Sequence, residues 1–122
     1  MAGDIDYVSA HATSTPGGDG EEAVAIATVF GANKARLHVS GVKSMTGHLL
    51  GGAGAMGLFA AVLAIHDQVV PPTINLENLD PACAELGLNF TPNVAVRKPV
   101  RAALANSFGF GGTNASIVVA KV

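Results

Sequence analysis

Short apolar segments alternate with a helix-like segment along the first third of the chain. Ile5–Ala10 is apolar, partly β-branched and ends in a polar cluster, which predicts a buried strand. Asp19 and Glu22 have the spacing of a capping box and predict the start of a helix that runs to Gly31. Leu37–Val42 is the second predicted strand. This order is that of a β-α-β unit.

The middle of the chain contains a glycine-rich segment and an apolar helix. Glycines in KSMTGHLLGGAGAMG allow a backbone or a ligand to approach closely. Leu58–Gln68 is Ala-rich and apolar on most faces, which predicts a helix that is buried rather than resting on a surface. Pro71 and Pro72 prevent the helix from continuing.

The last part of the chain is predicted to close a sheet. Residues 75–99 have the composition of a loop. Two strands are predicted after them, at Ala102–Asn106 and Ala115–Val122, joined by the turn SFGFGGTN. We find no repeat or linker and expect a single domain over residues 1–122. The order of elements predicts an α/β fold with a layered, mixed sheet.

The composition excludes several classes of protein. Hydrophobic residues make up 49% of the 122 residues and charged residues 13%, which excludes disorder and indicates apolar surface covered from outside this chain. The net charge of -2, without a basic stripe, predicts no nucleic-acid binding. One cysteine excludes an internal disulfide and a four-thiolate zinc site. The acidic N-terminus is unlike a signal peptide and Leu58–Ile65 is too short to span a membrane, so we expect a cytoplasmic protein.

Three loops are rich in residues that carry chemistry. They are His11–Thr15, Lys43–His48 and Asn106–Asn114, and each follows a predicted strand. Ligands of open α/β sheets bind outside the carboxyl ends of strands, so the three loops are expected to converge on one site. Imidazoles there would exchange protons near neutral pH, and a glycine-flanked amide would face a developing oxyanion.

Each of these residues also has a purely structural interpretation. A lone histidine after a strand is more often a hydrogen-bonded structural residue, threonines often serve turns, and GFGG needs positive φ in a tight turn. We assign His38 and His66 to structure or surface and Cys83 to packing. A metal site at His11 and His48 lacks a third ligand, and GGAGAMG fits no phosphate-binding pattern.

Four runs in this chain together resemble the C-terminal part of β-ketoacyl-acyl carrier protein synthases. They are VSAHATSTPGGD, KSMTGHLLGGAGAMG, VVPPTIN and NSFGFGGTNAS, and the resemblance extends from Asp4 to Val119. Each run alone is a modest signal, whereas four in register are specific. The most similar branch is the elongating type II ketosynthase of the thiolase superfamily.

The resemblance implies the C-terminal half of a thiolase-like α/β fold and an acyltransferase of fatty acid biosynthesis. In this family a cysteine takes an acyl chain from acyl carrier protein, malonyl-acyl carrier protein loses carbon dioxide, and the enolate attacks the acyl thioester. The implied partners are acyl carrier protein with acyl or malonyl phosphopantetheine, and an N-terminal ketosynthase half or a second copy of the chain. The resemblance implies no cofactor and no metal.

The resemblance also implies roles for individual residues. His11 and His48 match the two histidines that donate hydrogen bonds to the malonyl thioester carbonyl, where enolate charge builds. Lys43 matches the lysine that supports this pair electrostatically.

Four further positions match substrate-binding residues of the family. Thr13 and Thr15 match hydroxyl groups that contact the pantetheine arm. Phe110 matches the gating phenylalanine, whose amide contributes to the acyl oxyanion hole, and Phe108 matches its packing partner.

The chain departs from the family pattern in four respects. The nucleophilic cysteine of the family lies in the N-terminal half, and Cys83 stands in a different context. The opening strand and helix of the C-terminal half are expected to be missing. Gly57 replaces the family glutamate that partners the lysine, and Ser9 replaces the family asparagine before the first histidine.

Three functional hypotheses follow. The first is the C-terminal portion of a 3-oxoacyl-acyl carrier protein synthase, inactive alone because the nucleophile is absent. The second is a non-catalytic remnant that acts as a binding or pairing module. The third is residual malonyl decarboxylation by the two histidines. In each case exposed apolar sheet surface predicts self-association.

Overall fold

A mixed sheet forms the centre of the fold in the computed structural model, which describes residues 1–122. Its strands are β1 (Tyr7–Ser9), β2 (His38–Ser40), β5 (Ala102–Gly109) and β6 (Thr113–Ala120), in the order β2-β1-β5-β6. β1 pairs in parallel with β2 and β5, and β6 pairs antiparallel with β5. The prediction of an α/β fold with a mixed sheet is confirmed.

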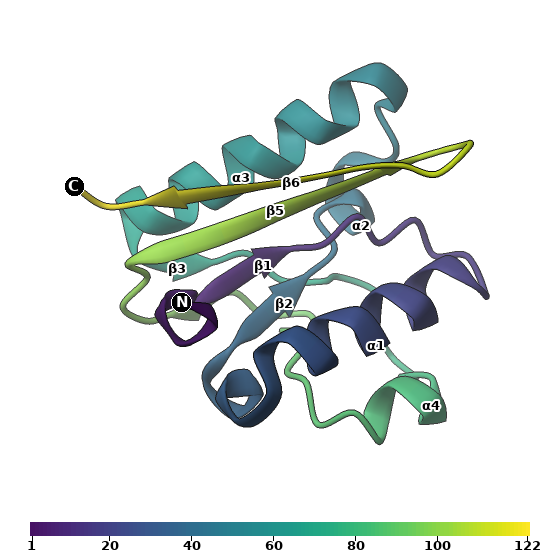
Figure 1. Ribbon diagram of the computed structural model, residues 1–122, viewed down its shortest axis with the longest axis horizontal. Coiled ribbons are helices and arrows are strands. Elements are labelled where there is room, and N and C mark those ends of the chain that lie inside the picture. The colour runs from purple at the N-terminus through teal and green to yellow at the C-terminus, as the bar shows by residue number, and fades with distance from the viewer.

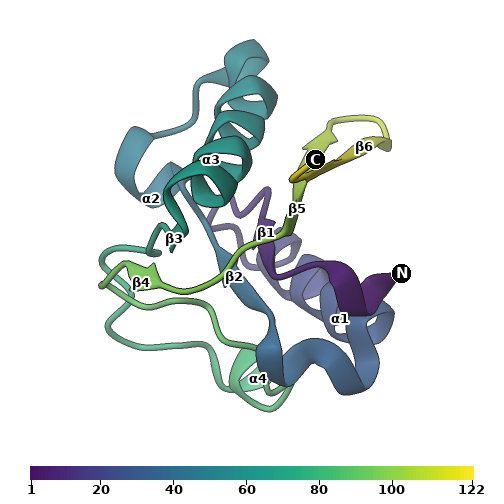
Figure 2. The same ribbon diagram turned by 90° about the vertical axis from the view of Figure 1, so that its left-hand side faces the viewer.

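Two long helices cover opposite faces of this sheet (Figures 1 and 2). They are α1 (Gly18–Phe30) and α3 (Ala53–Asp67). The short elements are the 3₁₀ helices η1 (Ala2–Asp4), η2 (Gly31–Arg36) and η3 (Leu50–Gly52), the helices α2 (Lys43–Thr46) and α4 (Pro81–Ala84), and the strands β3 (Val69–Val70) and β4 (Val96–Arg97).

Alternation along β1 divides the core into two parts. Val8 packs with Ile26 and Phe30 of α1 in one cluster, whereas Tyr7 packs with Ala61 and Ala64 of α3 in the other. Successive side chains of a strand point to opposite faces, so the short buried strand anchors both helical layers.

The start of α1 differs from the predicted capping box. The N-cap is Gly17 and no side chain caps it. The Asp19 carboxylate accepts a hydrogen bond from the Ser14 amide, and the buried Glu22 carboxylate accepts from the His11 and Ala12 amides. Both acids therefore bind the loop after β1 and not their own helix. The capping-box prediction was wrong because spacing alone does not reveal these competing donors.

The prediction that the Ala-rich helix is buried on most faces is also corrected. α3 is buried along one stripe, made of Ala53, Gly57, Ala61 and Ala64. Phe59 on another face is 57% exposed, and Val62 and Leu63 are also exposed. Small side chains let α3 lie close to the sheet, while its remaining apolar faces have no cover within this chain.

One helical stretch is long and apolar enough to cross a membrane by length and composition alone. Leu50–Asp67, which joins η3 to α3, is 18 residues long with a mean hydropathy of 1.4. The sequence-based expectation considered only the shorter run Leu58–Ile65. Core helices of layered proteins pass the same test, and Ala61 and Ala64 of this helix are buried against the sheet. We therefore interpret α3 as a layer of the fold.

The predicted loop over residues 75–99 contains regular structure. α4 begins after Asp80, whose carboxylate accepts a hydrogen bond from the Ala82 amide. β3 and β4 pair antiparallel, with Val70 opposite Val96. Such short strands carry no periodic signal, and their pairing depends on where the helices place them.

The hairpin of β5 and β6 is longer than predicted at the end of β5. Ala102 pairs with Ala120 and Gly109 pairs with Thr113. Gly111 and Gly112 have φ values of 81° and 83°, so the turn needs glycine as the sequence predicted. The ladder therefore brings the FGFGG turn to the end of the sheet.

We predict that an ion pair at the starts of β1 and β5 makes the free energy of unfolding depend on pH in the acid range. The Asp6 carboxylate accepts hydrogen bonds from the amide and the guanidinium of Arg101. Burial raises the pKa of Asp6, but the hydrogen bonds and charge of Arg101 outweigh it and hold that pKa below 3.8. The resulting stabilisation is present above the ordinary pKa and is lost as the pH falls through the folded-state pKa.

Asp6→Asn should therefore lower the free energy of unfolding at pH 7 by about 1.5 kcal/mol, a value reduced because the guanidinium is largely exposed. Urea unfolding at pH 7 and at a series of lower pH values that reaches below the folded-state pKa of Asp6 measures the effect, with the exposed Glu77→Gln as control. A difference between wild type and variant that stays constant across the whole pH series would contradict this account.

Candidate active site

The three chemistry-bearing loops converge at one edge of the sheet. β1, β2 and β5 run parallel, so the segments that follow them leave the sheet on the same side. The ring centroids of His11 and His48 lie 6.0 Å apart with an interplanar angle of 87°. The ring of Phe108 lies 5.4 Å from that of His11. Residues from three separate segments thus form one cluster.

Lys43 lies behind His11. It begins α2, and its Nζ lies 3.5 Å from His11 Nδ1 and also donates a hydrogen bond to the His11 carbonyl oxygen. Burial, followed by the positive charge of Lys43, lowers the pKa of His11 below 6.5. The His11 imidazole is therefore neutral at pH 7.

The hydrogen bonds of the two histidines assign the same tautomer to both. The Leu50 amide donates to His48 Nδ1 over 3.0 Å, which requires that this nitrogen carries no proton. The Lys43 ammonium has only donors, so His11 Nδ1 is also an acceptor. In each neutral ring the proton then resides on Nε2. The cluster thus offers two Nε2–H donors.

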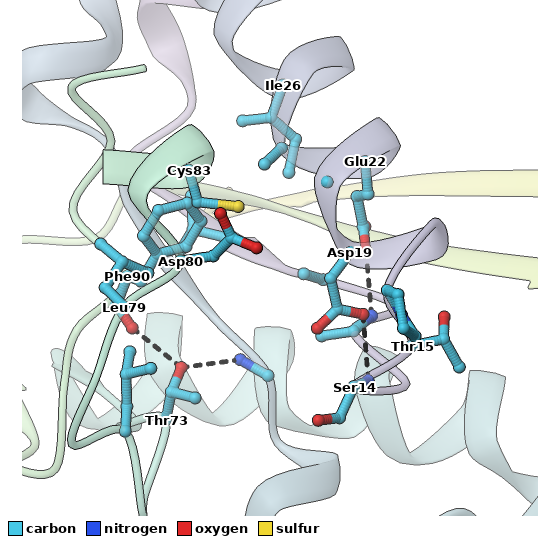
Figure 3. A pocket seen from close by; sticks show the side chains of 18 of the residues that line it. Ser14, Thr15, Asp19, Glu22, Ile26, Thr73, Leu79, Asp80, Cys83 and Phe90 are labelled. Atoms are coloured by element: carbon cyan, nitrogen blue, oxygen red, sulfur yellow. Dashed lines mark hydrogen bonds between the residues drawn. The ribbon is translucent and has the colours of Figure 1, made fainter. Parts of the chain in front are cut away.

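Glu22 is a site residue that the sequence analysis placed only in a helix cap. Its carboxylate accepts hydrogen bonds over 2.9 Å from the His11 and Ala12 amides and over 3.0 Å from Asn106 Nδ2 (Figure 3 shows it facing this loop). Burial is the main cause that lowers the pKa of Lys43, and the negative charge of Glu22 acts in the opposite direction and raises it. Glu22 therefore ties α1, the His11 loop and β5 together and supplies a counter-charge.

A sequence signal for Glu22 existed. Ile26 and Phe30 form the buried stripe of α1, and Glu22 stands one helical turn before Ile26 on the same stripe. A carboxylate on the buried face of a helix needs partners from elsewhere in the fold.

An open cavity of about 1160 Å³ lies over the histidine pair. Its lining includes His11, Thr13, Thr15, His48, Phe108 and Phe110. The hydroxyls of Thr13 and Thr15 lie 3.2 Å apart, and Phe110 is fully exposed at the hairpin turn. The cavity is therefore lined by every predicted site residue except Lys43, which acts from behind His11.

The two positions at which this chain has a different residue from the family, Ser9 and Gly57, lie next to each other. Ser9 at the end of β1 is fully buried and its hydroxyl has no hydrogen-bond partner within the chain. A Cβ atom at Gly57 of α3 would lie 3.4 Å from Ser9 Oγ. The replacements at Ser9 and Gly57 thus affect one spot beneath the site. The charge near Lys43 comes instead from Glu22 and Asp19.

A second cavity, of about 420 Å³, lies between α1 and the segment around α4 (Figure 3). It is lined by Asp19, Asp80, Cys83 and Phe90, among others. Burial, followed by the Asp80 and Asp19 carboxylates, raises the pKa of the Cys83 thiol. Cys83 belongs to the buried core beside α1, as its assignment to packing predicted.

The remaining histidines lie away from the cluster. His38 Nδ1 lies 3.2 Å from Thr91 Oγ1, and the exposed His66 contacts Asp67. Both agree with the assignment to structure or surface. No group of three or more His, Cys, Asp or Glu side chains is placed to hold a metal ion.

We predict that Lys43 controls the titration of His11. His11 should titrate below pH 6.5, and Lys43→Gln should raise its pKa because a neighbouring positive charge is removed. NMR titration of the imidazole Cε1–H, assigned with His11→Gln, measures this, and Lys34→Gln is the control because Lys34 binds the Leu86 carbonyl instead. A His11 pKa that does not respond to Lys43→Gln would refute the contact.

Comparisons with known proteins identify the family of this chain. Residues 1–77 match the family model "Beta-ketoacyl synthase, C-terminal domain". The chain is 51% identical over 118 residues to 3-oxoacyl-[acyl-carrier-protein] synthase 2 of Coxiella burnetii, covering 97% of this chain and 28% of the relative. It is also 51% identical over 121 residues to the mitochondrial 3-oxoacyl-[acyl-carrier-protein] synthase of Arabidopsis thaliana, covering 97% of this chain and 26% of the relative.

Solved ketosynthases have the same fold. The ishigamide ketosynthase/chain length factor superimposes with a TM-score of 0.92 and 40% identity, over 100% of this chain and 29% of that chain. A type II polyketide ketosynthase in complex with its acyl-carrier protein gives a TM-score of 0.92 and 38% identity, over 100% of this chain and 29% of that chain. The thiolase-like expectation is confirmed, and the chain spans less than a third of these relatives. The chain therefore belongs to the β-ketoacyl synthase family, in which it corresponds to the C-terminal part of a 3-oxoacyl-acyl carrier protein synthase 2.

Proposed function

We propose that this chain supplies the enolate-stabilising part of a 3-oxoacyl-acyl carrier protein synthase active site. The observation that carries the proposal is that the rings of His11 and His48 lie 6.0 Å apart and line one cavity, while the Nδ1 atom of each contacts another group of the chain. This arrangement leaves Nε2–H of each ring as the proposed donor. Two preorganised donors suit a carbonyl oxygen that gains negative charge during the reaction.

The proposed chemistry is a decarboxylative Claisen condensation. The bond between the malonyl carboxylate and Cα breaks, carbon dioxide leaves, and the electron pair moves onto the thioester carbonyl as an enolate. His11 and His48 donate hydrogen bonds to that oxygen. Cα then attacks the acyl carbonyl held as a thioester on a cysteine, and the thiolate leaves. Both donors gain strength as charge develops, so they favour the transition state over the ground state.

Lys43 acts through His11 in this proposal. Its ammonium keeps the proton off Nδ1, which leaves Nε2–H as the donor, and it lowers the pKa of His11. Glu22 holds the His11 loop and balances the charge of Lys43. This balance supports a working site despite the loss of the family glutamate at Gly57.

The substrate side of the proposal rests on the lining of the same cavity. Thr13 and Thr15 carry neighbouring hydroxyls that suit the amide groups of a pantetheine arm. Phe108 packs on His11, and the exposed Phe110 on its glycine turn serves as a gate. Acyl carrier protein is the proposed donor of malonyl and acyl groups, in line with the relative solved with its carrier protein.

The nucleophilic cysteine is proposed to lie in the remainder of the enzyme. Cys83 is excluded by its place in the core beside α1, away from the histidine cluster. The 122-residue chain alone is therefore expected not to condense. A non-catalytic pairing role remains the second candidate, and Gly57 beside the unpartnered Ser9 is the observation that favours it.

A segment exchange distinguishes the two functions. Residues 1–122 replace the matching segment of the Coxiella burnetii relative, and condensation of malonyl- with acyl-acyl carrier protein is measured. The hybrid should form 3-oxoacyl product. Circular dichroism and a mass in solution equal to that of the native relative show whether the hybrid is folded and assembled. A folded hybrid that forms no product would refute the catalytic proposal and favour the pairing module.

A further inference from the structure

We infer that the cavity between α1 and α4, here called the α1–α4 cavity, binds a compact apolar molecule that carries one ammonium group. Its volume of about 420 Å³ lies within the range of small-molecule sites, roughly 300–1,000 Å³. It is separate from the cavity over the histidine pair, because neither His11 nor His48 lines it. The inference therefore does not depend on the proposed function.

The inner wall of the α1–α4 cavity is apolar and firmly packed. Its side chains belong to the core cluster beside α1 and include Ala23, Ile26, Val39 and Cys83. The hydroxyl of Thr73, which also lines the cavity, already has two partners within the chain. It donates a hydrogen bond to the Phe90 carbonyl and accepts one from the Gly41 amide. This wall therefore favours an apolar body in the occupant.

Two carboxylates at this cavity each keep one oxygen free for a ligand. Asp19 Oδ1 accepts a hydrogen bond over 3.0 Å from the Ser14 amide. Asp80 Oδ1 accepts a hydrogen bond over 2.8 Å from the Ala82 amide. The Oδ2 atoms of both side chains have no hydrogen-bond partner, and neither side chain forms a salt bridge. Both residues line the cavity, Asp19 from α1 and Asp80 from the start of α4.

Cys83 shows that both charges act on the same part of the cavity. Its buried sulfur lies beside the Asp80 carboxylate, with Asp19 on the opposite wall (Figure 3). Burial, and after it the charges of Asp80 and Asp19, raises the pKa of the Cys83 thiol. A thiol is only a weak hydrogen-bonding group, so the two carboxylates are the groups there that can bind a charged ligand.

The lining selects a cation, and among cations an ammonium group. No lysine, arginine or histidine lines the cavity. The third carboxylate of the lining, that of Glu22, is already bound to the His11 and Ala12 amides and to Asn106. A metal ion would need more ligands, and no group of three or more His, Cys, Asp or Glu side chains is placed to hold one. An ammonium group has only donors, which suit two free carboxylate oxygens.

Titration of the 122-residue chain with 2-phenylethylammonium, followed by ¹H–¹⁵N NMR, tests the site. The amide signals of Ile26, Leu79 and Cys83 should shift, because these residues line the cavity. The neutral 2-phenylethanol has the same apolar body and is the matched ligand. It should bind about tenfold more weakly, because it leaves both carboxylates without an opposite charge.

Three variants and one control separate the contributions of charge and space. Asp80→Asn should weaken binding of 2-phenylethylammonium about tenfold while α4 stays folded, because asparagine caps a helix as well as aspartate does. Asp19→Asn should act similarly and keeps an acceptor for the Ser14 amide. Cys83→Met should abolish binding because its longer side chain fills the cavity. Glu77→Gln removes an exposed charge outside the cavity and should bind like the wild type.

Circular dichroism confirms that each variant is folded before its affinity is compared. Absence of binding, equal affinity for 2-phenylethanol, or unchanged affinity in both Asp80→Asn and Asp19→Asn would each overturn the inference. So would an equal loss of affinity in Glu77→Gln, which would show that only the net charge of the chain matters. Amide shifts confined to His11, His48 and Phe108 would assign the ligand to the histidine cavity and would also overturn it.

Discussion

Replacing His48 with alanine is expected to lower the condensation rate of the hybrid enzyme by about a hundredfold to a thousandfold. His48 Nε2–H is one of two donors proposed for the enolate oxygen. Its loss removes stabilisation from the transition state and little from the bound substrate, so kcat should fall while KM changes little. Steady-state kinetics with malonyl-acyl carrier protein as the varied substrate measure both parameters.

A matched set of variants separates this role from a structural one. His11→Ala should cause a loss of similar size, whereas His66→Ala should have no effect because His66 is exposed and contacts only Asp67. The double variant should lose less than the sum of the two single losses, in free energy, because both act on one oxygen. Full activity of His48→Ala in a folded hybrid would refute the proposed pair.

Glu22→Gln is expected to destabilise the chain by about 3 kcal/mol and to reduce the activity of the hybrid. Both carboxylate oxygens of Glu22 accept backbone hydrogen bonds, from His11 and from Ala12. A glutamine side chain has one acceptor oxygen, so its NH₂ group would face one of these amide donors in a buried place. Urea unfolding of the chain measures the loss.

The titration of His11 distinguishes the electrostatic effect of Glu22 from its structural effect. The Glu22 charge holds the pKa of His11 up, so Glu22→Gln should lower that pKa further. Glu21→Gln, at the exposed neighbouring position, is the control and should leave stability and titration unchanged. Unchanged stability of Glu22→Gln would show that the carboxylate does not hold the His11 loop.

The convergence of the three loops could be predicted from the sequence because it depends on local features. Each loop follows a short apolar strand, and parallel strands deliver their following segments to one edge. His11, His48 and Phe108 were therefore expected together before any distance was known. The glycine turn was also predictable from local sequence. Gly111 and Gly112 have positive φ, a conformation that glycine adopts more readily than other residues.

The role of Glu22 and the exposure of α3 could not be predicted in this way. The third partner of Glu22, Asn106, lies 84 residues later, and the spacing to Asp19 suggested a local cap instead. The apolar faces of α3 indicated burial, but burial depends on what packs against the helix. In this chain the sheet covers one stripe of α3 and leaves Phe59 exposed.

The central claim is that His11 and His48 donate hydrogen bonds to the same thioester oxygen, and infrared difference spectroscopy tests it most directly. A ¹³C=O-labelled acetyl-pantetheine thioester is bound to the hybrid, and the carbonyl band is compared with that in water. We expect the band to shift to lower frequency in the wild type, by a smaller amount in each single histidine variant, and to show the smallest shift in the double variant. A band that is the same in the wild type and in both single variants would contradict the account.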